Sequence, residues 1–296
     1  MWPEVDWLLL LEVSLAGLGS GGLYALAGLA FVLIYKATRV VNLAIGEMLM
    51  MGAYFMFAAV SGLGWPIWAG IIVAVLGSGV LGMVVERLLI RPMLGESPIS
   101  VFMITVGLSS ILVGLVELLW GADQLRLPAF LPSDPVMIGE AMVAPKIFYG
   151  FLVAAGLIAT VLITFSVWRG GVALRATASD QAAAYSMGID VPRVFSMAWA
   201  VAAMVAAVAG ILVGSISSLS PTMGVFGLAV LVVVIVGGLD SVPGALVGGL
   251  LVGLVESWTG MYLGGEYRLV ATFSLLVVVL MVRPYGLFGT REIERL

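Results

Sequence analysis

The chain has 296 residues, of which 62% are hydrophobic and only 10% are charged, and its formal net charge is −4. Soluble domains carry about 25% charged residues, so this composition predicts a polytopic membrane protein without a soluble domain of any size. Because the sequence contains no cysteine and no histidine, it excludes disulfides, thiolate chemistry and proton transfer by imidazole.

The first residues predict mature sequence, because Met1–Val13 carries acids where a signal peptide would carry Lys or Arg. Beyond them, apolar stretches of ~20 residues, enough to cross a bilayer core, alternate with short polar breaks. This pattern predicts an all-α membrane protein of about 8–9 transmembrane helices, some of them broken. The first four spans are expected over 13–35, as two spans between 42 and 92 with a turn at 61–66, and over 98–120. A polar loop at 121–145, a fifth span over 147–168 and a loop at 169–193 follow. Two spans over 194–239 divided at 217–221, a break at 237–244, an eighth span and a ninth over 268–282 complete the order.

The distribution of Lys and Arg predicts the orientation of these spans. With the N-terminus outside, the inner loops hold ten of them: Lys36, Arg39, Arg87, Arg91, Arg169, Arg175, Arg193, Arg283, Arg291 and Arg295. The outer loops then hold three: Arg126, Lys146 and Arg268. Since cytoplasmic loops are enriched in basic residues, we expect the C-terminus and the loop 169–193 to face the cytoplasm.

Two short patterns recur and suggest an internal repeat. Asn42-x-x-x-Gly46 returns as Asp240-x-x-x-Gly244, and Arg91-Pro92 returns as Arg283-Pro284. We therefore expect a single transmembrane domain over 1–296, with a first repeat at about 13–95, central spans at about 98–219 and a second repeat at about 222–289. Transporters are often built from such repeats, with binding sites at broken helices.

Polar residues at these breaks are the candidates for a translocation pathway. Asn42 and Asp240 are good N-cap residues, so one interpretation is that they only cap helices at two chain breaks. The other is that the breaks line the pathway, although a carboxylate at Asp240 would repel an anionic solute. The candidate pathway residues are Asn42, Gly46, Glu47, Asp240, Ser241 and Gly244.

Three acids lie in or near apolar spans, namely Glu47, Glu117 and Glu256. A carboxylate in a membrane is costly, so each is expected either to pair with protein groups or to line the pathway. Glycines four residues apart have a plainer explanation. They allow close helix approach, as expected for Gly17 with Gly21, Gly244 with Gly248, and Gly249 with Gly253.

In the second half of the chain, the loop 169–193 is a long polar segment between apolar spans. We expect a short helix over Asp180–Met187, capped by Ser179 or Thr177 and stopped by Gly188. A small-residue helix held in water between spans is a candidate docking helix for a partner that supplies energy. The candidate docking residues are Arg175, Asp180, Ala183, Ala184 and Gly188.

No G-x-x-x-x-G-K-[ST] motif is present, since the only lysines are Lys36 and Lys146. Any work driven by ATP therefore requires a separate ATPase chain. We expect this chain to be no enzyme, to bind no cofactor or metal itself, and to have no nucleic-acid partner.

Four stretches resemble the branched-chain amino acid permease family of bacterial ABC importers, the LivH-type membrane subunit. They are Ser20-Gly-Gly-Leu-Tyr-Ala-Leu with Asn42-Leu-Ala-Ile-Gly-Glu47, the loop pattern from Arg175 to Ile189, Gly237-Gly-Leu-Asp240-Ser-Val-Pro-Gly244, and Arg283-Pro-Tyr-Gly-Leu-Phe-Gly289. The resemblance covers nearly the whole chain. The sequence departs from the family pattern at Leu43, Ile45, Ala182 and Asp240.

The resemblance implies a multi-pass permease of the bacterial inner membrane. It implies a second, related permease subunit, two ATPases docked on the cytoplasmic loops, and a periplasmic binding protein that delivers branched-chain amino acids or a related small organic solute. A homodimer or a heterodimer of permeases remains open, as do an amide, urea or an aromatic acid as cargo. An ion-coupled secondary transporter or channel is the alternative, with Glu47, Glu117, Asp240 and Glu256 as its intramembrane acids. An intramembrane enzyme is a more distant one, because serine chemistry lacks its histidine.

Overall fold

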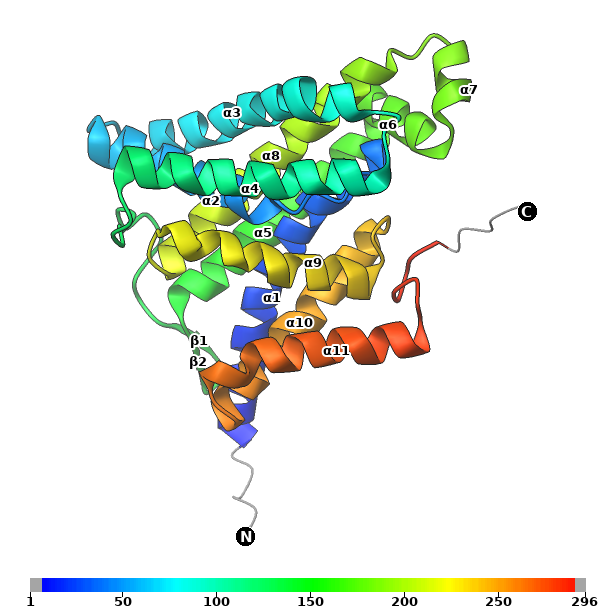
Figure 1. Ribbon diagram of the computed structural model, residues 1–296. Coiled ribbons are helices and arrows are strands. Elements are labelled where there is room, and N and C mark those ends of the chain that lie inside the picture. Colours follow the sequence, from blue (N-terminus) through cyan, green and yellow to red (C-terminus); the bar gives the residue numbers. More distant parts are fainter. Residues whose placement is uncertain (1–6, 291–296) are drawn as a thin grey trace. The chain divides into compact units, whose positions relative to one another are not determined.

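The computed structural model describes residues 7–290 as a helical protein with one small hairpin (Figure 1). The first residues of the expected mature start, Met1–Asp6, lie outside the described residues, and so do Arg291 and Arg295 of the charge pattern. The longer helices are α1 (Trp7–Thr38), α2 (Ile45–Phe57), α3 (Ile67–Val85), α4 (Pro98–Trp120), α5 (Pro145–Val167), α8 (Val191–Ile216), α9 (Phe226–Gly237), α10 (Val242–Tyr262) and α11 (Arg268–Val282).

Short elements connect them. Single turns of π-helix, η1 (Ala58–Gly62) and η2 (Glu86–Ile90), extend α2 and α3, and 3₁₀ turns form η3 (Arg91–Met93), η4 (Pro221–Val225) and η5 (Gly265–Tyr267). The loop 169–193 contains α6 (Arg169–Ser179) and α7 (Gln181–Ser186). The polar loop expected at 121–145 contains an antiparallel hairpin of β1 (Val136–Ile138) and β2 (Ala141–Val143) that pairs Val136 with Val143.

Eight helices in the described part of the chain are long and apolar enough to cross a membrane. They are Trp7–Thr38, Ile45–Gly62, Ile67–Met93, Pro98–Trp120, Pro145–Val167, Val191–Ile216, Val242–Tyr262 and Gly265–Val282. The predicted all-α class is therefore confirmed. The expected seventh span corresponds to the shorter apolar segment Pro221–Gly237, which begins with the 3₁₀ turn η4.

The chain divides into two compact units, and α1, α5 and α9 contribute residues to both. Unit 1 contains residues 7–28, 129–155 and 229–290 of the described chain. Here α1 packs on α10 through glycines, because a Cβ at Gly21 would meet the Gly249 carbonyl oxygen at 2.9 Å. A Cβ at Gly253 would overlap α1 backbone at Gly17 and Gly21. These contacts agree with the close helix approach expected from the glycine spacing.

Unit 2 contains Leu29–Pro128 and Gly156–Leu228, and its core is formed by α2, α3 and α8. Backbone contact is again close, because a Cβ at Gly210 of α8 would overlap the Leu49 carbonyl of α2, and one at Gly82 of α3 would overlap the Trp199 carbonyl. Trp199 and Tyr54 are the largest fully buried side chains of this core.

Within each unit, contacts join the chain breaks into two groups, one at each end of the unit. In unit 1, the Glu12 carboxylate accepts a hydrogen bond from the Met142 amide at 2.8 Å, whereas residues 236–240 contact 287–290. In unit 2, Arg91 bonds to Pro192 and Ser196, whereas Leu125 and Leu219 form a backbone bridge. Every one of these pairs joins breaks that the expected order of spans places on the same side. Which end faces the cytoplasm stays a prediction.

Candidate translocation and docking residues

Asn42 is fully buried in unit 2 and closes a turn before α2. Its Oδ1 accepts a hydrogen bond from the Ala44 amide at 3.0 Å, and its Nδ2 contacts Met48 Sδ at 3.3 Å. The N-cap of α2 is Ala44, which has no side-chain cap bond. The expectation that Asn42 caps the helix is therefore wrong, because an Asn side chain bonded two residues on forms its own turn instead.

Gly46 and Glu47 follow in the first turn of α2, beside η4. A Cβ at Gly46 would overlap the Gly224 carbonyl, so only glycine allows this approach of α2 to η4. Glu47 is 8% exposed, and its Oε2 has no hydrogen-bond partner among the described residues. A buried carboxylate oxygen without a donor is costly, so the described residues leave the charge of Glu47 unsatisfied.

The second predicted break lies in unit 1, where Ser241 is the N-cap of α10. Its hydroxyl accepts a hydrogen bond from the Gly244 amide at 3.0 Å. Asp240 instead accepts hydrogen bonds from the amide of Thr290, at 3.3 Å, and from its hydroxyl. The expected cap at Asp240 is thus one residue off, and its carboxylate holds the segment that follows α11.

The other two acids in or near apolar spans, Glu256 and Glu117, differ in their surroundings. Glu256 accepts hydrogen bonds on both oxygens, from the Tyr24 hydroxyl at 2.7 Å and from the Thr272 hydroxyl at 2.8 Å. It therefore links α10 to α1 and α11 as a structural group. Glu117 is exposed near the end of α4.

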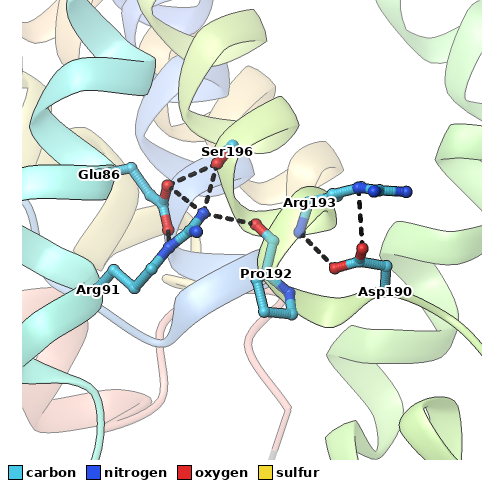
Figure 2. A network of polar contacts seen from close by, with 6 residues as sticks. All are labelled: Glu86, Arg91, Asp190, Pro192, Arg193 and Ser196. Atoms are coloured by element: carbon cyan, nitrogen blue, oxygen red, sulfur yellow. Dashed lines mark hydrogen bonds and ion pairs between the residues drawn. The ribbon is translucent and has the colours of Figure 1, made fainter.

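A network that sequence reasoning missed connects the segment after α3 to the beginning of α8 (Figure 2), and its centre is the ion pair of Glu86 with Arg91. Glu86 is fully buried, and both of its oxygens bond to Arg91, at 3.0 and 2.9 Å. Ser196 donates to Glu86 at 2.6 Å and accepts from Arg91 at 2.7 Å. The signal was a Glu and an Arg five residues apart, which face each other only where the helix widens to a π turn, as at η2.

The short helix expected over Asp180–Met187 is present as α7, and its caps differ from expectation. Asp180 is its N-cap, accepting from the Ala183 amide at 2.9 Å, whereas Ser179 donates to the Arg175 carbonyl of α6. Gly188 ends the turn after α7 at φ +82°, a left-handed conformation that glycine adopts without strain. The predicted stop at Gly188 is confirmed.

The two sides of α7 differ in their exposure to solvent. Ala184 is buried against the unit, and Ala183 is exposed. Two large apolar side chains point to solvent here, Tyr185 at 72% and Met187 at 83% exposed. Arg175 is already used within the chain, because its guanidinium donates to the carbonyls of Phe165 and Ser166 at the end of α5. The exposed residues of α7 and its C-cap are thus mostly small or apolar and carry no charge, which suits docking into a groove.

Fold and site together define a multi-pass, all-α membrane protein with a helix exposed in a loop between spans. Residues 13–282 match the family model of the branched-chain amino acid transport system / permease component. The chain belongs to this family.

Curated relatives match over almost their whole length. The high-affinity branched-chain amino acid transport system permease protein LivH of Escherichia coli strain K12 is 30% identical over 306 aligned positions, covering 98% of this chain and 99% of that protein. The permease protein BraD of Pseudomonas aeruginosa is 30% identical, covering 96% and 97%. A probable LivH of Methanocaldococcus jannaschii is 26% identical, covering 93% and 91%.

Among solved structures, PsaBC from Streptococcus pneumoniae in complex with Fab is similar at a TM-score of 0.51. It is 14% identical in sequence and covers 91% of each chain. This likeness concerns the fold alone.

Proposed function

We propose that this chain is the membrane-spanning permease subunit of a binding-protein-dependent ABC importer that carries branched-chain amino acids or a related small organic solute. The observation that carries the proposal is the match to permease relatives over nearly the full chain, with the helix breaks included. The exposed helix α7 supports it, because a permease without a nucleotide-binding motif needs a surface for a separate ATPase.

The assembly that we propose contains a second related permease subunit, two ATP-binding subunits and a periplasmic binding protein. The chain itself binds no cofactor, and ATP is used by the partners. Its place is the bacterial inner membrane, with the N-terminus outside and with α6, α7 and the C-terminus in the cytoplasm. The excess of Lys and Arg at one set of chain breaks supports this orientation.

Docking is tested by reversing the polarity of the exposed side of α7. In the reconstituted importer, we expect Met187→Glu and Ala183→Glu to abolish substrate-stimulated ATP hydrolysis, because a charge would enter an apolar contact. Ser217→Glu, an exposed position at the other end of unit 2, serves as the matched control and should behave as wild type. Full stimulation in both variants would refute docking through α7 and the residue that follows it.

The solute is tested on the protein that delivers it. We expect leucine, isoleucine or valine to raise the unfolding temperature of the cognate binding protein and to stimulate the reconstituted ATPases. A binding protein stabilised only by a large sugar or a metal ion would refute the substrate class, while leaving membership of the permease family intact.

A further inference from the structure

A cavity of about 610 Å³ opens in unit 2 between the end of α3 and the beginning of α8. Three arginines contribute to its lining, namely Arg87, Arg91 and Arg193. Three methionines line it as well, Met83 from α3 with Met197 and Met204 from α8. The cavity is therefore basic where the helices end and apolar where they continue into their spans.

The polar contacts in Figure 2 hold two of the three arginines, Arg91 and Arg193, and Arg87 adds a third positive charge to the lining. Arg91 is held by Glu86, Ser196 and the Pro192 carbonyl, so its guanidinium is fixed at the wall with a third of the side chain still exposed. Arg193 pairs with Asp190 at 2.9 Å and remains largely exposed. Arg87 is exposed and has no ion-pair partner among residues 7–290. Three guanidinium groups against the two carboxylates of Glu86 and Asp190 leave one positive charge in excess, and Glu86 is fully buried behind Arg91.

The depth of the cavity determines which kind of molecule fits it. At 1.5 Å per residue, Met204 lies about 20 Å along α8 from Val191, the first residue of that helix. Met83 lies within the candidate span Ile67–Met93, and both Met83 and Met204 retain exposed surface. A water-soluble anion or an acidic protein loop would meet the arginines but would leave this apolar length uncovered. A lipid acyl chain covers it.

We propose that this cavity binds an anionic phospholipid of the phosphatidylglycerol type. The headgroup phosphate lies among Arg87, Arg91 and Arg193, and one acyl chain follows Met83, Met197 and Met204. Basic pockets between membrane helices favour anionic headgroups, and guanidinium groups match phosphate oxygens in pairs. The inference requires only that α3 and α8 lie in the membrane, and it is independent of the solute carried.

Binding is measured on the purified chain in a neutral detergent, by titration with dioleoylphosphatidylglycerol and native mass spectrometry. Each arginine near an anionic lipid contributes about five-fold in affinity, so Arg87→Gln and Arg193→Gln should each weaken binding about five-fold and the double variant about 30-fold. Arg126→Gln, an exposed arginine at the other end of unit 2, should bind as wild type. Dioleoylphosphatidylcholine should bind no more tightly to wild type than to the double variant.

A second measurement places the acyl chain. Phosphatidylglycerol with a diazirine on its acyl chain should label peptides that contain Met83 or the 197–204 stretch, both in the chain alone and in the assembled importer. Equal binding of phosphatidylcholine, unchanged binding in the double variant, or labelling confined to other helices would overturn the proposal. Binding of soluble glycerol phosphate as tight as binding of the lipid would overturn the proposal and assign the site to a small anion. Loss of labelling in the assembled importer would also overturn the proposal, because it would mean that a partner subunit fills the cavity.

Discussion

At the scale of single residues, Glu47 differs from Glu86 and Glu256, because one oxygen of its carboxylate has no donor among residues 7–290. Glu86 and Glu256 each satisfy both oxygens within the chain. A zwitterionic amino acid brings an ammonium group that could complete such a carboxylate. Glu47 is therefore the residue of the predicted pathway whose charge we expect to matter most for transport.

Replacing Glu47 by Gln removes the charge while keeping the size and one acceptor oxygen. Hydrogen bonds to charged groups contribute about 1.5–3 kcal/mol, so we expect uptake of leucine at normal expression to fall at least about ten-fold. Glu117→Gln, at an exposed position near the end of α4, is the control and should transport normally. Unchanged uptake in Glu47→Gln would mean that its role is structural.

The two neighbours at the start of α10 should respond differently to substitution. Ser241→Ala removes the cap and should lower the free energy of unfolding by about 1 kcal/mol, whereas Ser241→Asp should restore it, because Asp also caps. Asp240→Asn keeps an acceptor for Thr290 but loses the charge, so we expect a smaller loss. Thermal unfolding of the detergent-solubilised chain distinguishes them, and a larger effect at Asp240 than at Ser241 would contradict this assignment.

The sequence predicts that Asp240 and Ser241 are polar residues at a helix break, but it does not predict which groups they bond to. Asp240 and Ser241 are adjacent and both suit an N-cap, so local chemistry could not choose between them. A contact with Thr290, 50 residues away in sequence, decided the matter. Glu86 and Arg91 escaped notice for a related reason, since ordinary helical periodicity places residues five apart on different faces. Gly188 was predictable because its left-handed conformation is a purely local requirement.

At the scale of helices, α2, α3 and α8 make close backbone contacts in the core of unit 2. In the membrane the hydrophobic effect contributes little between helices, so packing supplies most of the stability. The α2–α8 contact depends on Gly210, where the Leu49 carbonyl leaves no space for a Cβ.

Gly210→Ala should therefore destabilise the chain by about 1–3 kcal/mol, the usual cost of overpacking. Gly107→Ala in α4 is the matched control, because a Cβ there meets nothing within 4 Å. That variant should be neutral or slightly stabilising, since alanine favours a helix by up to about 1 kcal/mol over glycine. Equal unfolding temperatures of the two variants would show that the α2–α8 contact adapts to a methyl group.

For the whole molecule, the orientation depends on whether the short segment Pro221–Gly237 crosses the bilayer. Its 3₁₀ turn and α9 together extend about 28 Å, close to the ~30 Å of a hydrocarbon core. Nine crossings would place the two termini on opposite sides, whereas eight would place them on the same side. The order of spans was predictable from apolar length alone, but such a short segment lies at the limit of that criterion.

Because the chain has no cysteine, single cysteines report on this directly. With a membrane-impermeant maleimide on intact cells, we expect Ser217→Cys to be labelled and Pro243→Cys to be labelled only after the inner membrane is permeabilised. Both positions are exposed, and they flank the segment. Ser186→Cys on α7 is the cytoplasmic reference. Labelling of Ser217→Cys and Pro243→Cys from the same side would remove α9 from the set of crossings.

Unit 1 can be completed only late in synthesis, because the segment after α11 bonds to the end of α9. The amides of Leu287 and Phe288 bond to the last carbonyls of α9, at Val236 and Gly237, at 2.8 and 2.9 Å. These carbonyls belong to a helix that is translated long before its donors, so the end of α9 waits through the synthesis of α10 and α11. A premature stop just after Val282 would therefore yield a chain that keeps α1 to α11 and leaves the carbonyls of Val236 and Gly237 without these donors. Such a product would keep the same apolar spans, so we expect it to differ from the full chain in the closure of unit 1 rather than in its membrane spans.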